Sequence, residues 1–196
     1  MKKNIGRPKA FDEQEALKIA MHYFWEHGYD KSSLSGLLEA MNIKKSSFYQ
    51  TFKSKEHIFR LSLELYAKMS YEYMQGLKKE MGAKGVLLHI VYETISELRE
   101  TGKVKGCLLA NSSSECFSNH PHFNELISYK FKTFRKLFKE LIEEAQNEGE
   151  IKNTLPSSTL GSIYQSLING LVQMIQLGAS KEELNAVIKH IEELLT

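Results

Sequence analysis

One segment, residues 33–52, constrains the fold of this chain more than any other: SLSGLLEAMNIKKSSFYQTF. Its first half places apolar residues at i, i+3, i+4 and i+7, which is one face of a short helix: Leu34, Leu37, Leu38 and Met41. Ser33 precedes this face as an N-cap candidate, and Asn42 follows it with a side chain that tolerates a left-handed turn. Phe48 and Phe52, four residues apart, predict a second short helix. Two short helices joined by a tight turn predict a helix-turn-helix, whose second helix enters the major groove of DNA.

Lys44 and Lys45 stand where the second helix of this motif begins. The helix dipole makes that end positive, so each lysine costs about 0.3–1 kcal/mol unless an anion lies nearby. With a phosphate at this end, the lysines and the free helix amides would all face a negative charge. We therefore interpret the pair as part of a DNA-binding face. The alternative is a solvated basic patch without a ligand.

The longer segment WEHGYDKSSLSGLLEAMNIKKSSFYQTFKSKEHIF resembles the DNA-binding segment of the TetR (tetracycline-repressor) family of bacterial transcriptional regulators. The resemblance covers residues 10–61, and the positions that carry it are Phe24, Gly28, Tyr29, Leu37, Tyr49, Phe52, Lys55 and Ile58. Three positions depart from the family pattern: Asn42 replaces the usual turn glycine, Lys44 the usual serine cap and Thr51 the usual histidine. The last two lie near the DNA in the family, so these departures concern the detailed contacts and not the fold.

The resemblance implies a repressor that binds a palindromic operator of double-stranded DNA as a homodimer. Four residues would approach bases, namely Lys44, Lys45, Ser46 and Ser47, and four would hold phosphates, namely Ser33, Tyr49, Thr51 and Lys55. The last two helices would form a two-fold, four-helix dimer interface through Leu160, Ile163, Leu167, Leu171, Ile188 and Ile191. A small-molecule inducer of unknown identity would bind between the fourth and seventh helices, near Met69, Cys107, Asn111, Phe131 and Tyr164.

The composition favours an all-α protein. The chain has 196 residues, of which 42% are hydrophobic and 26% charged, and only three are proline. No apolar run approaches the roughly 18 residues of a membrane span, so we expect a cytoplasmic protein without membrane contact. Apolar periodicity predicts about nine helices. We divide them into a helix-turn-helix domain at residues 1–54, opened by a basic arm at residues 1–10, and an effector-binding and dimerisation bundle at residues 55–196.

Net charge is distributed unevenly along the chain. Residues 1–60 contain 11 Lys and Arg against 7 Asp and Glu, whereas the remaining residues contain 15 against 17. The basic excess therefore coincides with the helix-turn-helix, as binding to nucleic acid predicts.

Polar residues mark where several helices begin. Asp12, with Glu15 three residues later, predicts the start of the first helix. Near the C-terminus, Ser157 or Ser158 is expected to cap a helix just after Pro156. The last helix is expected to start in the same way as the first, with Ser180 and Glu183 forming a capping box.

The two cysteines are expected to be thiols. If they share a helix, the nine residues between Cys107 and Cys116 place them about 13 Å apart, too far for a disulfide. Cys107 follows Gly106 at an expected helix start close to two lysines, a setting that favours the reactive thiolate. A Gly-Cys pair followed by an asparagine, here Asn111, resembles a subset of TetR-type regulators, some of which sense electrophiles or oxidants. The alternative is that Cys107 packs as a small hydrophobic residue.

Other functions find weaker support in the sequence. Cys116, His120 and His122 form a C-x3-H-x-H pattern that could recruit a metal, but we favour a solvated loop as its explanation. We predict no metal and no cofactor, since no Gly-rich phosphate loop or hydrolase motif is present. Two further alternatives are an architectural DNA-binding protein without an effector and an enzyme that uses Cys107 as its nucleophile.

Overall fold

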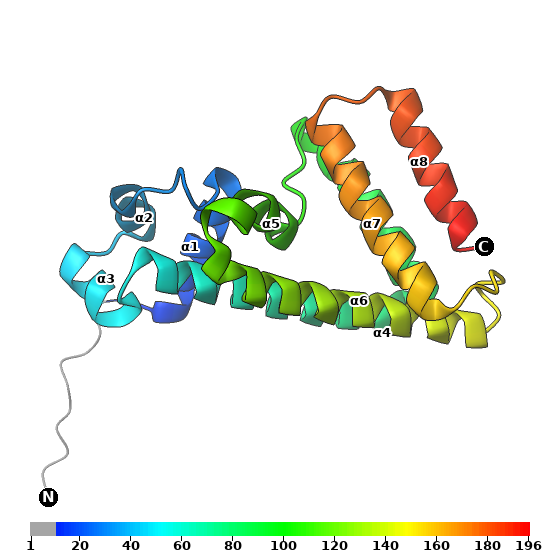
Figure 1. Ribbon diagram of the computed structural model, residues 1–196, viewed down its shortest axis with the longest axis horizontal. Coiled ribbons are helices and arrows are strands. Elements are labelled where there is room, and N and C mark those ends of the chain that lie inside the picture. Colours follow the sequence, from blue (N-terminus) through cyan, green and yellow to red (C-terminus); the bar gives the residue numbers. More distant parts are fainter. Residues whose placement is uncertain (1–10) are drawn as a thin grey trace, which may run out of the picture. The chain divides into compact units, whose positions relative to one another are not determined.

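The computed structural model describes residues 11–196, so the basic arm expected at residues 1–10 lies outside the described residues. Helices are the only regular secondary structure in the described part, which has no strand, and this confirms the predicted all-α class. Eight α-helices and one 3-10 helix follow one another along the chain (Figure 1): α1 Glu13–His27, α2 Leu34–Met41, α3 Lys45–Phe52, α4 Lys55–Thr101, α5 Leu108–Asn119, η1 Pro121–Phe123, α6 Asn124–Asn147, α7 Ser157–Gln176 and α8 Lys181–Leu194.

The predicted number of about nine helices is close to the observed one. Helix α4 contains a break at Gly82, whose φ of 73° and ψ of 175° are not helical. Such a backbone conformation favours glycine, because a Cβ atom is strained at positive φ. Within residues 11–196, no helix combines the length and the apolar composition needed to cross a bilayer.

The described residues form two compact units, which are divided between Tyr66 and Ala67. The first turns of α4 belong to the first unit, whereas the sequence-based division assigns them to the second. Because α4 starts in one unit and ends in the other, its apolar pattern continues across the boundary between the units. The position of this boundary therefore cannot be read from the sequence.

The first unit is built on well-capped helices around an aromatic core. Asp12 accepts hydrogen bonds from the backbone N–H groups of Gln14 and Glu15 at 2.8 and 3.1 Å, which confirms the predicted start of α1. The core side chains that are at most 3% exposed include Phe24, Leu37, Phe48, Phe52, Ile58 and Phe59. Phe24 and Phe59 meet edge to face, with ring centroids 4.9 Å apart, so the N-terminal turns of α4 are packed against α1.

The second unit contains a tightly packed pair, α6 and α7, followed by α8, which runs antiparallel to α7 (Figure 1). Gly161 makes the close approach of α6 and α7 possible, because a Cβ atom there would lie 3.0 Å from the backbone nitrogen of Lys139. Ser180 and Glu183 form the predicted capping box at the start of α8. The backbone and side-chain hydrogen bonds with Ser180 lower the pKa of Glu183 from its ordinary value.

The start of α7 differs from the sequence expectation. Helix α7 begins at Ser157, and its N-cap position is Pro156, which has no side-chain hydrogen bond to offer. Ser157 and Ser158 therefore lie inside the first turn and do not cap it. Proline fixes φ near −65° and can occupy this position, and the sequence pattern alone did not distinguish a serine cap from serines at the first helical positions.

Candidate DNA-binding site

The turn between α2 and α3 has the predicted local structure. The Ser33 hydroxyl accepts a hydrogen bond from the backbone N–H of Gly36 at 3.0 Å, which caps α2. Asn42 ends α2 with φ of 51° and ψ of 45°, the left-handed conformation expected there. Glycine at position 36 leaves room for the Tyr23 side chain of α1, because a Cβ atom at this position would lie 2.1 Å from the Tyr23 hydroxyl. These contacts fix α2 against α1 and thereby set the direction in which α3 leaves the turn.

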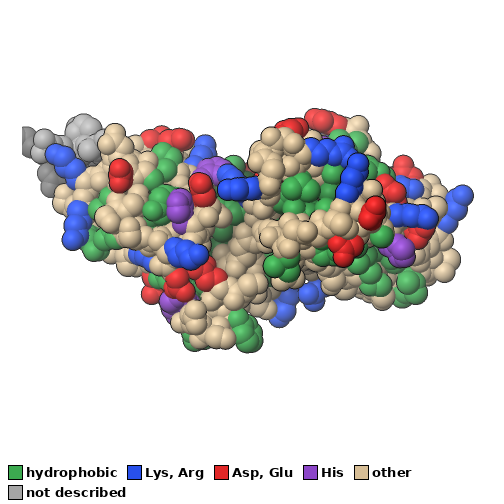
Figure 2. Space-filling view, turned by 90° about the horizontal axis from the view of Figure 1, so that it is seen from above, with side chains coloured by type: hydrophobic (Ala, Val, Ile, Leu, Met, Phe, Trp, Pro, Cys, Tyr) green, Lys and Arg blue, Asp and Glu red, His purple; other side chains and the backbone are tan. Residues whose placement is uncertain are grey.

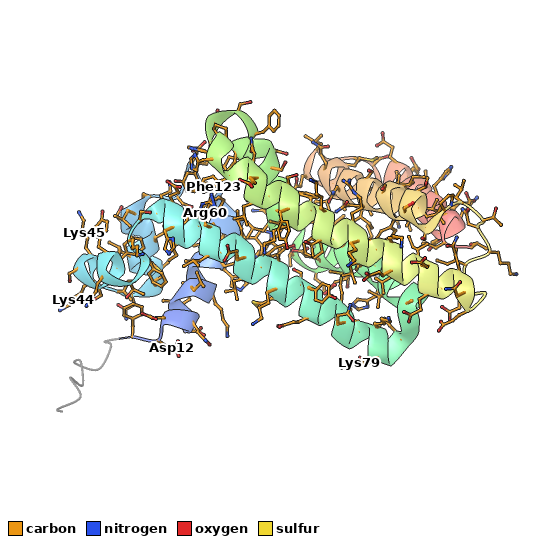
Figure 3. All side chains as sticks on the ribbon, turned by 60° about the horizontal axis from the view of Figure 1, so that its bottom comes forward. Asp12, Lys44, Lys45, Arg60, Lys79 and Phe123 are labelled. Atoms are coloured by element: carbon orange, nitrogen blue, oxygen red, sulfur yellow. The ribbon has the colours of Figure 1, made fainter. Side chains whose placement is uncertain are left out.

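Helix α3 buries one side and exposes the other. Phe48 and Phe52 are 0% and 3% exposed and attach the helix to the core of the first unit. Most of the residues predicted to approach DNA are accessible: Lys44, Lys45, Ser46 and Tyr49 are exposed, and Ser47 and Thr51 are partly exposed. Figure 3 labels Lys44 and Lys45 at the start of α3. The structure therefore brings these residues of α3 together on one accessible surface.

The N-terminal ends of α2 and α3 are suited to anions. Neither helix has an acidic residue in its first turn, and Lys44 occupies the N-cap of α3 without a side-chain cap. Four lysines but a single acidic residue, Glu39, lie between residues 34 and 55. On the face drawn in Figure 2, by contrast, basic, acidic and hydrophobic side chains are interspersed. The positive helix end and the local excess of lysine thus give α3 an electrostatic preference for phosphate.

Lys55 and Ser33 lie at two other helix starts of the same unit. The Lys55 ammonium nitrogen is 4.2 Å from the centroid of the Tyr29 ring, a cation–π distance. The Tyr29 ring in turn lies 4.6 Å from Phe59, which is fully buried, so the aromatic platform is fixed. Ser54 caps α4 by accepting a hydrogen bond from the backbone N–H of His57 at 3.0 Å. This arrangement holds a partly exposed cation at the start of α4.

Two further exposed residues of α3 were not among those predicted from the sequence. Gln50 and Lys53 are exposed on the same side of the helix as Lys45, Ser46 and Tyr49. Lys53 ends α3 with a φ of 63°, a left-handed conformation that is uncommon for a residue other than glycine. Helical periodicity counted from Phe48 and Phe52 would have placed both residues on the open side.

In the second unit, Cys107 lies at the start of α5 and is partly exposed, whereas Cys116 is fully buried. Two hydrogen bonds hold the loop before Cys107, one from α5 and one from α7. The Asn111 side chain on α5 donates to the Lys105 carbonyl at 2.8 Å, and the Gln176 side chain on α7 donates to the Val104 carbonyl at 3.3 Å. Gly106 completes the contact with a φ of 69°, and a Cβ atom there would lie 2.5 Å from Val172. The sequence analysis included Cys107 and Asn111 but missed Val172 and Gln176, the α7 residues that contact the loop before Cys107.

The other residues predicted for an effector pocket have different environments. Tyr164 is completely buried, and its hydroxyl donates a hydrogen bond to the Leu87 carbonyl at 2.7 Å. Burial raises the pKa of Tyr164 far above its ordinary value, so the phenol stays neutral. Met69 is 40% exposed and Phe131 is partly exposed. Within residues 11–196, no group of three or more His, Cys, Asp and Glu side chains is arranged to hold a metal ion.

The six residues predicted for the dimer interface divide into two groups. Leu160, Leu171 and Ile191 are 0% exposed, so they pack inside a single chain and a second copy cannot reach them. The remaining three are accessible: Ile163 is 36% exposed, and Leu167 and Ile188 are partly exposed. Gly170, one turn beyond Leu167 on α7, has open space around it.

Comparison with known families identifies both units. The family described as "Bacterial regulatory proteins, tetR family" matches residues 16–61, which include α2 and α3. The family described as "Tetracyclin repressor-like, C-terminal domain" matches residues 86–191, more than half of the chain. Together, the helix-turn-helix geometry and these matches define the class of the protein as a helix-turn-helix transcriptional regulator that binds DNA.

Individual relatives agree with this class. The HTH-type transcriptional repressor ComR of Escherichia coli is 26% identical over 186 residues, which cover 94% of this chain and 89% of the relative. The uncharacterized HTH-type transcriptional regulator YezE of Bacillus subtilis is 27% identical over 148 residues, which cover 75% and 76%. A cysteine variant of the TetR-family regulator CifR, solved with 26-bp operator DNA, superposes with a TM-score of 0.79 at 26% identity, covering 97% of this chain and 100% of CifR.

The fold alone is shared with more distant structures. Reduced NemR of Escherichia coli superposes with a TM-score of 0.78 at 19% identity, covering 93% of this chain and 96% of that one. The chain belongs to the TetR family of bacterial regulatory proteins.

Proposed function

We propose that this protein is a repressor that binds a palindromic operator as a homodimer and leaves it when an inducer binds to the second unit. The observation that carries the proposal is the surface of α3, on which two lysines, a serine and a tyrosine are exposed while two phenylalanines anchor the helix. A short helix with this division can enter the major groove without disturbing the core beneath it. ComR is named a repressor and CifR was solved on operator DNA, and both cover most of this chain, which supports the same role here.

We assign the DNA contacts by position. Base edges would be approached by the residues at the start of α3: Lys44, Lys45, Ser46 and Ser47. Phosphates would be held by residues at other helix starts and at the flank of α3: Ser33, Tyr49, Thr51 and Lys55. Contacts to phosphate fix the register on the duplex, whereas contacts to bases select the sequence. The exposed Gln50 and Lys53 extend this surface along α3.

Replacing Lys55 by alanine tests this docking. Because Lys55 would contact a phosphate, Lys55→Ala is expected to weaken binding about equally on operator and on random duplex. The slope of log K against log salt concentration should fall by about one, since one counterion fewer is released. Both quantities are measured by fluorescence anisotropy between low and physiological salt. Lys18→Ala on α1, an exposed lysine paired with Glu15, is the control and should change neither. An unchanged slope in Lys55→Ala would contradict the assignment.

The dimer would form through α7 and α8. Of the six residues predicted for the interface, Ile163, Leu167 and Ile188 are accessible, and Gly170 leaves room for the close approach of a second α7. Residues of a two-fold interface meet their own copies or one another, so a single apolar stripe is sufficient. Such a dimer would present two α3 helices to successive major grooves, with the DNA-binding domain at residues 1–54 and the effector-binding and dimerisation domain at residues 55–196.

The inducer would act through the second unit, and we propose that a thiol-reactive compound can do so at Cys107. The partly exposed Cys107 lies at the positive end of α5, in a sequence with lysines two and four residues before it. The adjoining loop is fixed to α7 through Val104 and Gly106, so a group added to the sulfur would have to displace packed atoms.

Operator release by N-ethylmaleimide tests the role of Cys107. Treatment of the wild type is expected to lower operator affinity at least about tenfold, since overpacking by added atoms costs about 1–3 kcal/mol. Cys107→Ser should keep its affinity after treatment. Cys116→Ser should respond like the wild type, because Cys116 is fully buried. Mass spectrometry reports which thiol is modified. Release that persists in Cys107→Ser, or an unresponsive wild type, would show that Cys107 only packs.

A further inference from the structure

A basic groove lies between α6 and the start of α7, and none of its lining residues is among those assigned above to DNA, dimer or thiol chemistry. Its volume is about 290 Å³, and six side chains line it: Lys132, Arg135, Lys136, Lys139, Ser158 and Ser162. The four cations come from one side of α6, since they are spaced at i, i+3, i+4 and i+7. The two hydroxyls come from the first turns of α7. None of the lining residues is acidic.

The positive charge of this groove is only partly balanced. In the sequence, Glu125 and Glu140 enclose a stretch that contains five basic residues and no acidic one. Lys136 lies 3.7 Å from Glu140, and Lys139 lies 2.9 Å from Glu143, both one turn further along α6. Among residues 11–196, Lys132 and Arg135 form no ion pair. Like charges at neighbouring positions of a helix destabilise it, so this arrangement is unfavourable for the folded chain without an anion.

A buried amide holds Arg135 in place. The Gln165 side chain on α7 is only 7% exposed, and its Oε1 accepts a hydrogen bond from the Arg135 Nε at 3.2 Å. The Gln165 Nε2 donates to the Phe131 carbonyl at 3.5 Å, which fixes the orientation of the amide. Burying a polar side chain is costly unless it is hydrogen-bonded, and here the bond orients a guanidinium at the edge of the groove. Since Nε is engaged, the terminal nitrogens remain available for a planar, bidentate acceptor.

The packing of α6 on α7 shapes the floor of the groove. At Gly161 the two helices approach backbone to backbone, and a Cβ atom would lie 3.0 Å from the Lys139 nitrogen. Ser158 and Ser162 flank this point with small side chains, and the Ser162 hydroxyl donates to the Ser158 carbonyl at 2.9 Å. Helix α7 begins at Ser157, after the N-cap residue Pro156, with no side-chain cap and no acidic residue in its first turn. Its positive end therefore adds to the field of the four cations.

We propose that this groove binds a phosphate-bearing small molecule. Phosphate matches the lining: a guanidinium recognises two of its oxygens at once, lysines supply point charges and the Ser158 hydroxyl can donate a hydrogen bond. A multiply charged anion also matches four cations better than a carboxylate would. The volume is at the lower end of the range for small-molecule sites, which fits a short phosphorylated compound or an inorganic polyphosphate and excludes a folded partner.

Calorimetric titration of the full-length protein with pyrophosphate at constant ionic strength tests the proposal. Saturable binding is expected for the wild type. Arg135→Gln and Lys132→Gln should each weaken it about tenfold or more, because a hydrogen bond to a charged group contributes about 1.5–3 kcal/mol. Lys130→Gln is the matched control: Lys130 lies on α6 but outside the groove, and its ammonium is 5.5 Å from the Tyr129 ring centroid. The affinity of Lys130→Gln for pyrophosphate should stay within about twofold of the wild-type affinity.

Three comparisons make the outcome decisive. Gln165→Leu leaves every charge in place but removes the hydrogen bond that orients Arg135, so it should weaken pyrophosphate binding. Attraction to the net positive charge alone predicts no change in this variant. Lys44→Gln/Lys45→Gln removes the DNA-binding lysines and should leave the titration unchanged. Titrations with 5′-AMP and glucose 6-phosphate distinguish a nucleotide from a sugar phosphate as the organic source of the phosphoryl group. No saturable binding of pyrophosphate to the wild type, or equal weakening in Arg135→Gln and Lys130→Gln, would overturn the proposal.

Discussion

Replacing Leu167 by glutamate is expected to turn dimers into monomers and to lower operator affinity by about 10²–10⁴-fold, the advantage that a second linked binding site provides. Leu167 is partly exposed on α7, one turn from Ile163 and beside the open space at Gly170. In the dimer two copies of this carboxylate would face each other across an apolar interface. An unpaired charge in such a place costs several kcal/mol, and the two-fold axis doubles the cost.

Sedimentation and light scattering measure the mass, and anisotropy measures binding to the operator. Ile163→Glu is a second variant at a more exposed position and should act in the same way with less risk to folding. Thr133→Glu adds the same charge to an exposed position of α6 and should remain a dimer. Circular dichroism shows whether each variant is folded. Folded Leu167→Glu and Ile163→Glu proteins that remain dimeric would show that α7 is not the interface.

The helix-turn-helix could be read from the sequence because its signals are local. Ser33 caps the helix that follows it within three residues, and Asn42 adopts its turn conformation without help from distant residues. Phe48 and Phe52 are four residues apart, which fixes their common face once a helix is assumed. Once the buried face of α3 is assigned from the spacing of these two residues, the exposed residues of the helix can be predicted from the sequence as well.

The second unit could be predicted only as a set of helices. Leu160, Leu171 and Ile191 share the apolar stripe with Ile163 and Leu167, but only the packing of α7 against its neighbours shows which of them lie inside the chain. An apolar helix face that packs against a second copy of the chain and one that packs against two helices of the same chain have the same sequence pattern.

Long-range polar contacts were also out of reach. Gln165 reaches Arg135 from thirty positions away, and Gln176 reaches Val104 from more than seventy. Neither pair has a sequence spacing that repeats, so no periodic pattern reveals it. Gly106 could be recognised as a turn glycine but not as the neighbour of Val172. These contacts define the basic groove and the Cys107 loop, which explains why the effector side of the molecule is the part that required a structure.

The central claim is that α3 reads a defined sequence in a symmetric operator. A regulator of this kind should prefer its operator to random duplex by about 10³-fold or more at physiological salt, whereas an architectural protein binds both about equally. The preference would arise because the proposed phosphate contacts of Lys55 and Ser33 would form on every duplex, while Lys44, Lys45 and Ser46 would contact only matching bases.

Selection from a random-sequence duplex pool with the full-length protein, followed by affinity measurement at physiological salt, tests this claim most directly. We expect one palindromic sequence whose half-site centres are about 34–36 Å apart, one turn of the double helix, as two α3 helices of a two-fold dimer require. The selected duplex should bind at least about 10³-fold more tightly than random duplex of the same length. A selected pool without symmetry, or affinities for selected and random duplex within a few fold, would contradict the account.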